Sequence, residues 1–204
     1  LSGSAMDLRY ADAHTNAILQ AWYPGAEGGT AVADVLFGRV SPSGKLPVTF
    51  YKDTSDLPEF TDYSMKNRTY RYAENNVLYP FGYGLTYGKI VCTLVEYKDG
   101  KAVVTAENTG GKTVDDVIQL YIKDYCENAV PNVSLCGFKR VNLAAGEKMF
   151  VEISVSERAF TAVDENGERN RFGSRFTLYA GTHQPDEISE KLCGTKCVST
   201  EINL

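Results

Sequence analysis

The sequence predicts a mainly β protein in which an antiparallel β-sandwich follows a partial α/β segment and an extended connector. Three observations carry this prediction. Residues 1–50 contain a strand-loop-helix pattern, residues 51–88 are rich in turn-forming and aromatic residues, and residues 89–204 alternate apolar and polar side chains between frequent turns. We therefore expect three parts with boundaries at these positions.

The first part centres on the run AILQAWYPGAEGGTAVADVLF at residues 17–37. It predicts a buried strand over residues 18–22 and then a short helix with Val32, Val35 and Leu36 on one face. In a parallel α/β sheet, ligands bind in loops beyond the carboxyl ends of strands, and YPGAEGG occupies such a place. LSGSA at residues 1–5 looks like the end of another strand. A doubly wound sheet needs about five or six strands, so we expect a piece of a larger domain.

Three residues near this loop are weak candidates for substrate binding. Trp22 and Tyr23 carry rings that could stack on a sugar, although rings at the end of a buried strand are more often core or interface residues. Glu27 precedes the expected helix, where the helix dipole favours a carboxylate for structural reasons alone. The structural interpretation is therefore favoured for all three.

The connector predicts extended chain because prolines and glycines recur from residue 41 to residue 85 with few periodic apolar positions. Its aromatic rings carry apolar area that would be costly to leave in water. We therefore expect this stretch to lie flat on a domain surface and to join two domains. The rings belong to Phe50, Tyr51, Phe60, Tyr63, Tyr70, Tyr72, Tyr79, Phe81, Tyr83 and Tyr87.

The third part predicts short antiparallel strands, among them residues 103–108, 117–122, 150–155 and 175–180. About seven strands fit an immunoglobulin-like or fibronectin-type sandwich without the Cys-Trp-Cys pattern of true immunoglobulin domains. Residues 106–113, AENTGGKT, end like a phosphate-binding loop. They lack its first glycine and join two strands, so we expect a hairpin turn.

Composition excludes several classes of function. A net charge of -5 and no basic cluster argue against nucleic acids and anionic membranes as partners. Five cysteines, an odd number, predict free thiols and favour the bacterial cytoplasm, with secretion as the alternative. Cys193 and Cys197, with His183 nearby, are spaced too widely for a usual zinc knuckle, so we expect neither a metal nor a cofactor.

Catalytic motifs are scarce. His14 and His183 are the only histidines, and no nucleophile triad or metal-protease motif is present. The carboxylates of Asp115, Asp116, Glu157 and residues 164–168 fall at predicted strand ends and turns, where a solvated position is the default expectation. The sequence therefore assigns no catalytic residue to this chain.

Four blocks of residues nevertheless carry a resemblance to a known family. Residues 17–50, 69–87, 104–122 and 159–181 closely resemble, in order, the carboxyl-terminal part of glycoside hydrolase family 3. The resemblance implies a (β/α)8 barrel, an α/β sandwich domain and a fibronectin type III-like domain in the whole enzyme. This chain would hold the end of the second domain (1–50), the linker (51–88) and the third domain (89–204).

The resemblance also implies an activity for a parent enzyme. Family 3 enzymes are retaining hydrolases with a carboxylate nucleophile on the barrel and an acid/base upstream of the AWYPG block, and neither motif is present here. The connector at residues 45–72 is similar to that of β-xylosidases and α-arabinofuranosidases more than to that of β-glucosidases. The implied partners are an oligosaccharide substrate and the missing barrel and α/β domains, and a homo-oligomer stays open.

Two alternatives remain at this point. A free-standing carbohydrate-binding sandwich would need an exposed aromatic platform, with Tyr121, Tyr125 and Phe138 as its candidates. A purely structural module that braces the catalytic domains would need no binding site, and it is compatible with the family 3 interpretation.

Overall fold

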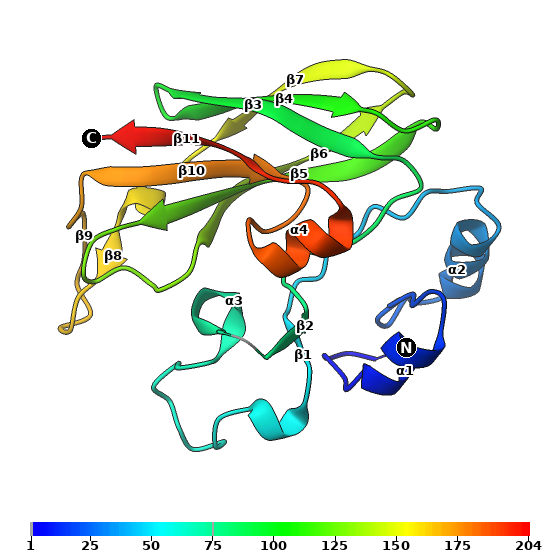
Figure 1. Ribbon diagram of the computed structural model, residues 1–204, viewed down its shortest axis with the longest axis horizontal. Helices are drawn as coiled ribbons and strands as arrows, with labels where there is room; N and C mark the ends of the chain where they lie inside the picture. Colours follow the sequence, from blue (N-terminus) through cyan, green and yellow to red (C-terminus); the bar gives the residue numbers. More distant parts are fainter. Residues whose placement is uncertain (1, 75) are drawn as a thin grey trace.

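The computed structural model describes residues 2–74 and 76–204, so the predicted strand end at residues 1–5 is described only from Ser2 onward, where no strand forms. A two-sheet β-sandwich forms the bulk of the molecule, and the first 88 residues lie along one side of it (Figure 1). The prediction of a mainly β protein with an antiparallel β-sandwich is confirmed. None of the helices in the described residues has the length and apolar content needed to cross a membrane.

The two sheets are antiparallel throughout. One contains four strands in the order β11-β10-β5-β6, and the other contains three in the order β3-β4-β7. The seven strands are β3 (Ile90–Lys98), β4 (Lys101–Asn108), β5 (Val114–Asp124), β6 (Ser134–Leu143), β7 (Lys148–Ser154), β10 (Arg175–Gly181) and β11 (Val198–Asn203). Three of the four strand segments predicted from alternation lie within these strands, and the fourth, 150–155, runs one residue past the end of β7. A short hairpin, β8 (Ala162–Val163) with β9 (Arg169–Asn170), lies at one end.

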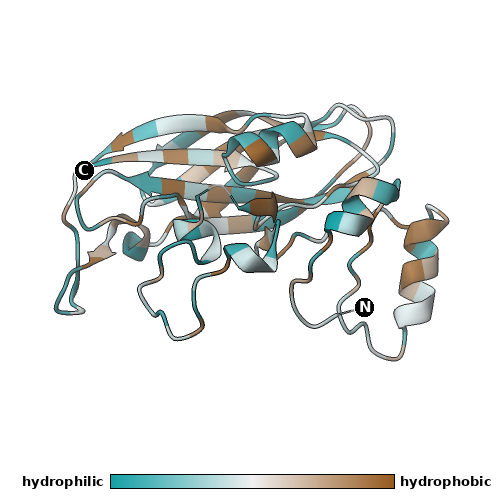
Figure 2. Ribbon diagram, turned by 60° about the horizontal axis from the view of Figure 1, so that its bottom comes forward, coloured by the Kyte–Doolittle hydropathy of each residue, from teal (hydrophilic) through white to brown (hydrophobic). Residues whose placement is uncertain are grey.

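The core lies between the inner faces of the two sheets. Successive side chains of a strand point to opposite faces, so every second residue is buried in this core. Figure 2 shows the resulting alternation of hydrophobic and hydrophilic residues along the strands. On β4, for example, Ala102, Val104 and Ala106 are all fully buried. Phe160, from the short helix η2 (Glu157–Phe160), closes one end of the core, because its ring packs edge-on against Phe176 with centroids 5.1 Å apart.

The connection between β4 and β5 corrects one prediction. AENTGGKT is not a hairpin, because β4 pairs with β3 and β7 while β5 belongs to the other sheet. The buried side chain of Asn108 makes this crossover possible: its Nδ2 donates to the carbonyls of Lys112 and Leu143 at 2.8 and 3.0 Å. Its Oδ1 accepts from the amide of Gly110, so the turn is hydrogen-bonded from within.

The amino-terminal part differs more from its prediction. The expected helix is present as α2 (Gly28–Leu36), and a second helix, α1 (Arg9–His14), precedes it. The expected buried strand at residues 18–22 is wrong: no strand forms there, and Ile18 and Leu19 are 39% and 43% exposed. A strand of a parallel sheet needs neighbouring strands for its backbone hydrogen bonds, and the described chain places none beside this segment.

The connector is mostly irregular, as expected, but it is anchored by short elements. These are β1 (Phe50–Tyr51), η1 (Thr54–Asp56), α3 (Thr69–Tyr72) and β2 (Val77–Tyr79), with β1 paired to β2. Tyr70 on α3 stacks on Phe81 with ring centroids 4.2 Å apart and meets the ring of Tyr121 edge-on. Phe60 and Tyr63 are instead 87% and 83% exposed, because their loop extends away from the rest of the chain (Figure 1).

The last helix, α4 (Glu187–Cys193), joins β10 to β11 and lies beside the connector (Figure 1). Asp186 caps its first turn by accepting hydrogen bonds from the amide and hydroxyl of Ser189. Gly194 ends it in the left-handed conformation, with φ of 63°.

Hydrogen exchange should separate the stable sandwich from the amino-terminal segment. We expect amides of residues 117–122 and 150–154 to exchange far more slowly than those of residues 18–22, because the former are paired in sheets and the latter are not. The measurement is native-state exchange on a monomeric sample. Equal protection of all three segments would contradict this picture of the fold.

Candidate functional site

The predicted loop candidates lie on the surface beside α2. Trp22 is half-buried, and its ring centroid lies 6.3 Å from that of Phe50 on β1. Its φ of 51° is in the left-handed region, which is unusual for a bulky residue and stores strain in this loop. The contact with Phe50 supports the packing interpretation of Trp22, and a role in sugar stacking stays a prediction.

Tyr23 and Glu27 are exposed. Tyr23 is 79% exposed, and one edge of its ring lies so close to Gly3 that a Cβ there would come within 2.5 Å of the ring. Glu27 precedes α2 at the N-cap position, but its side chain makes no capping hydrogen bond. The helix therefore does not use this carboxylate as a cap, and a binding role for either residue stays a prediction.

A buried ion pair joins Lys45, near the end of the amino-terminal part, to the sandwich. Lys45 Nζ lies 2.7 Å from Asp116 Oδ1 on β5, and it donates a second hydrogen bond of 2.7 Å to the carbonyl of Gly84. The two side chains are only 10% and 5% exposed. Asp116 Oδ1 also accepts from the amide of Val117. The expectation that Asp116 is solvated is therefore wrong, whereas its neighbour Asp115 is partly exposed and binds Arg140 as a surface residue.

The sequence held a signal for this difference. Successive side chains of a strand point to opposite faces, so Asp115 and Asp116 cannot both face solvent when one face of β5 is covered. Burial raises the pKa of Asp116, and the charge and hydrogen bond of Lys45 oppose that rise. Without Lys45, the carboxylate would be a buried and uncompensated charge.

A second set of contacts continues this seam between connector and sandwich. Gln119 Nε2 donates to the carbonyls of Gly82 and Thr182 at 3.0 and 2.9 Å, and Tyr121 Oη donates to Gln119 Oε1 at 2.6 Å. Gly82 has a φ of 79°, and a Cβ there would lie 2.3 Å from the Tyr121 hydroxyl. Only glycine fits at this position. We refer to these contacts, together with the ion pair of Lys45 and Asp116, as the polar seam.

The aromatic platform that a free-standing carbohydrate-binding sandwich would need does not form. Tyr121 is fully buried, while Tyr125 and Phe138 are 51% and 66% exposed. Phe138 on β6 pairs with Gln119, so along the sheet it lies six residues, or about 20 Å, from Tyr125. The rings therefore cannot stack on one sugar.

His183 and the cysteine thiols are placed as structural groups. His183 is 1% exposed, and its ring nitrogens lie 2.8 Å from the Gln184 carbonyl and 3.0 Å from the Thr195 hydroxyl. All five cysteines are free, and burial raises the pKa of the Cys193 thiol to about 11. Such a thiol is protonated at neutral pH and is a poor nucleophile or metal ligand. Within residues 2–74 and 76–204, no group of three His, Cys, Asp or Glu side chains is arranged to hold a metal ion.

Comparison with known proteins finds family matches for two parts of the chain. Residues 1–87 match the glycosyl hydrolase family 3 C-terminal domain, and residues 116–184 match a fibronectin type III-like domain. A xylan 1,4-beta-xylosidase of Xylanibacter ruminicola is 42% identical over 94% of this chain and 23% of its own length. A periplasmic beta-glucosidase of Salmonella typhimurium is 32% identical over 89% of this chain and 26% of its own length.

A solved structure extends the likeness to the whole fold. The beta-glucosidase from Kluyveromyces marxianus in complex with glucose superposes with a TM-score of 0.81 and 28% identity, covering 100% of this chain and 26% of that one. The chain thus spans about a quarter of the length of the relatives it matches.

Replacing Lys45 should destabilise the fold, because the buried Asp116 carboxylate would lose its partner. We expect Lys45→Met to lower the free energy of unfolding at pH 7 by about 3–5 kcal/mol, because it leaves Asp116 buried without a partner. A raised carboxyl pKa means that the folded state binds more protons than the unfolded state, so stability falls as pH rises above about 4. Urea unfolding should show a steeper fall between pH 4.5 and pH 7 for Lys45→Met than for the wild type.

Two variants control this experiment. Lys101→Met breaks an exposed pair with Glu152, whose side chains are 51% and 56% exposed, so it should cost less than about 1 kcal/mol. Adding Asp116→Asn to Lys45→Met removes the titrating group and should abolish the extra pH dependence. A loss from Lys45→Met no greater than that from Lys101→Met would overturn the assignment.

Proposed function

The chain belongs to glycoside hydrolase family 3, and on that premise we propose that it is the carboxyl-terminal part of a retaining, exo-acting glycoside hydrolase in carbohydrate degradation. The observation that carries the proposal is the continuous match of 94% of the chain to a xylan 1,4-beta-xylosidase of which it spans 23%. Within such an enzyme, this region would release no sugar itself. It would brace the domains that do.

The polar seam supports the bracing role. Lys45 and Gly82 belong to the region that matches the family 3 C-terminal domain, whereas Asp116 and Gln119 belong to the sandwich. A buried ion pair and buried hydrogen bonds restrict relative motion at this junction. Breaking them would leave buried polar groups without hydrogen-bond partners. The sandwich is thereby fixed in orientation against the α/β segment.

We further propose that this chain alone is inactive. Retaining hydrolysis needs a nucleophilic carboxylate and a carboxylic acid of raised pKa about 5 Å apart. Asp7 and Asp53 do come together, but both bind the Arg9 guanidinium. Hydrogen bonds from Arg9 to Asp7 and from Ser55 to Asp53 lower the pKa of each carboxyl, so neither suits the acid role. Glu27 stands alone at the start of α2.

The xylosidase and arabinofuranosidase branch is our preferred assignment for the parent. It rests on the connector at residues 45–72 and on the 42% identity to a xylan 1,4-beta-xylosidase. A free-standing carbohydrate-binding module is less well supported, because the three rings that could form its aromatic platform do not lie together on one exposed surface. The five free thiols support a reducing compartment, and we propose the cytoplasm.

The activity proposal predicts different results for this chain and for the full-length parent enzyme. The purified 204-residue chain should leave aryl xylosides, arabinosides and glucosides uncleaved, and the full-length parent should cleave aryl xylosides or arabinosides with retention at the anomeric carbon. Release of the aryl group and NMR of the first-formed sugar are the measurements. Turnover by the chain alone that Glu27→Gln abolishes would contradict the first half. A parent far more active on aryl glucosides would contradict only the branch assignment.

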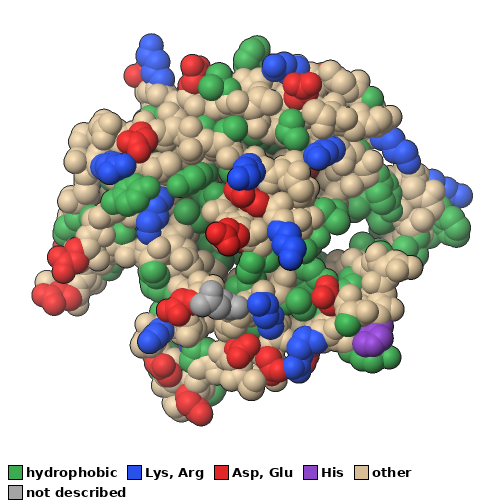
Figure 3. Space-filling view, in the orientation of Figure 1, with side chains coloured by type: hydrophobic (Ala, Val, Ile, Leu, Met, Phe, Trp, Pro, Cys, Tyr) green, Lys and Arg blue, Asp and Glu red, His purple; other side chains and the backbone are tan. Residues whose placement is uncertain are grey.

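The proposed partnership also predicts an uncovered apolar surface. Leu36 and Phe37 at the end of α2 are 67% and 80% exposed, and hydrophobic side chains gather over this region in Figure 3. Large uncovered patches normally mark interfaces. We expect the isolated chain to bind an apolar dye or to self-associate, and Leu36→Ser with Phe37→Ser to reduce either effect. The exposed Phe150→Ser on β7 is the control. A monomer without dye binding would argue against a missing partner domain.

A further inference from the structure

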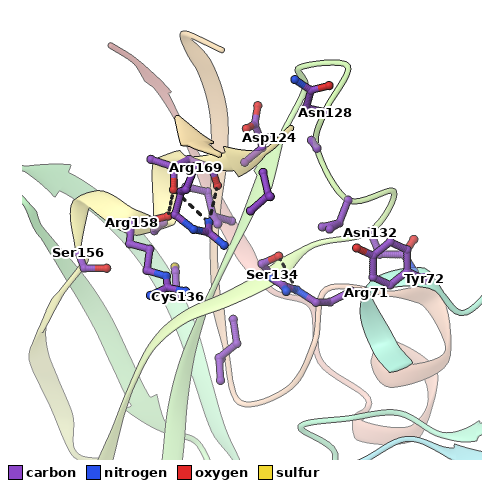
Figure 4. A pocket seen from close by; sticks show the side chains of 18 residues that line it. Arg71, Tyr72, Asp124, Asn128, Asn132, Ser134, Cys136, Ser156, Arg158 and Arg169 are labelled. Atoms are coloured by element: carbon purple, nitrogen blue, oxygen red, sulfur yellow. Dashed lines mark hydrogen bonds between the residues drawn. The ribbon is translucent and has the colours of Figure 1, made fainter. Parts of the chain in front are cut away.

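A polar cavity of about 360 Å³ lies on the sandwich, away from the loop of Trp22 and Glu27. Its walls come from α3 of the connector, the segment between β5 and β6, η2 and the hairpin of β8 and β9. In Figure 4, Arg158 and Arg169 lie at one end, and Arg71 approaches with Ser134 at the other. Its volume is within the range of small-molecule sites.

The charge of this cavity is opposite to that of the protein. Three arginines line it, Arg71, Arg158 and Arg169, against one carboxylate, that of Asp124. The described residues provide no ion pair for any of the three guanidinium groups. Asp124 is already engaged, because its two oxygens accept from the amide and the thiol of Cys126. In a chain of net charge -5, this is an unneutralised concentration of positive charge.

Most donors of the three guanidinium groups stay available. Each carries five N–H groups. Arg71 uses Nε on the Ser134 hydroxyl at 3.1 Å, and Arg169 uses Nη1 on the hydroxyl and carbonyl of Thr161 at 3.2 and 3.4 Å. These bonds orient the two side chains without saturating them. The planar fork of arginine matches the paired oxygens of a carboxylate or a phosphate.

The remaining lining suits a hydroxylated molecule. Asn128 and Ser156 present amide and hydroxyl groups, and Tyr72 presents an aromatic ring. Asn132 holds the wall in place, because its Nδ2 donates to the carbonyls of Tyr70 and Ala73 at 3.0 and 2.8 Å. The cavity therefore combines charge recognition with polar contacts for the body of a ligand.

We propose that this cavity binds a small oxyanion on a hydroxylated body, in the chemical class of sugar acids and sugar phosphates. The shared chemistry is a carboxylate or phosphate group held by Arg158 and Arg169 at one end, with Arg71 facing the body of the ligand from the other end. The site lies between connector and sandwich, so a bound anion would hold the two together. The inference concerns this chain alone and stands independently of the activity of the parent enzyme.

Titration calorimetry on the 204-residue chain tests the proposal with four probes: glucuronate, glucose 6-phosphate, inorganic phosphate and glucose. We expect the sugar acid or the sugar phosphate to bind, more tightly at low salt, and neutral glucose to bind at least tenfold more weakly. The stronger of the two charged sugars identifies the oxyanion. If inorganic phosphate binds as tightly as the charged sugars, the proposal that the cavity recognises a hydroxylated body is wrong. If glucose binds as tightly as they do, the proposal of an anion site is wrong.

Variants assign the binding to the cavity. Arg158→Gln and Arg169→Gln should each weaken the anion by about tenfold or more, since a hydrogen bond to a charged group contributes about 1.5–3 kcal/mol. Arg140→Gln, on β6 but paired with Asp115 outside the cavity, removes the same charge and should leave affinity unchanged. Thermal unfolding followed by circular dichroism checks that each variant is folded. If Arg158→Gln does not fold, Arg158→Lys is used instead, because it keeps the positive charge but removes the planar guanidinium. Unchanged affinity in both cavity variants, or no binding by any anion, overturns the proposal.

Discussion

The arrangement of this chain depends on one buried ion pair. Lys45 and Asp116 come from parts of the sequence about seventy residues apart, and each side chain is nearly inaccessible to water. Such a pair contributes little net stability relative to a well-packed apolar contact, because both charges must be desolvated. It is costly to break, however, so it selects one arrangement of the amino-terminal part and the sandwich over all others. The hydrogen bonds of Gln119 and Tyr121 extend this selection along the same junction.

This constraint connects the fold with the function. The loop of Trp22 and Glu27 and the helix α2 have few buried side chains of their own, and only Gly28 is buried in α2. Their orientation relative to the sandwich is therefore set through the connector, by the polar seam and by the stacking of Tyr70 on Phe81. Under the proposed bracing role, this junction would hold the sandwich in place against the domains that carry the active site.

The sequence predicts the sandwich well and the amino-terminal part poorly, for a physical reason. Strands such as β7 turn one face to the other sheet within the chain, so alternation from Phe150 to Ile153 predicts which side chains are buried. β5 alternates only as far as Ile118, because the connector also covers its outer face at Gln119 and Tyr121. Ile18 and Leu19 have the composition of a buried strand, but no neighbouring strand within residues 2–74 and 76–204 covers them. The burial of Asp116 and the cavity of Arg71 and Arg158 arise from tertiary contacts across long stretches of sequence, which local patterns do not report.

The exposed loop of Phe60 and Tyr63 has a consequence for variation in length. Its base is closed on both sides, by the pairing of β1 with β2 and by α3 packed on the sandwich. Because these contacts fix where the chain leaves and returns, the loop can grow or shrink without moving either end. Doubling the length of a flexible loop costs only about 0.6 kcal/mol in closure entropy. This is therefore a place where insertions and deletions can accumulate between related chains while the junction beneath them keeps its geometry.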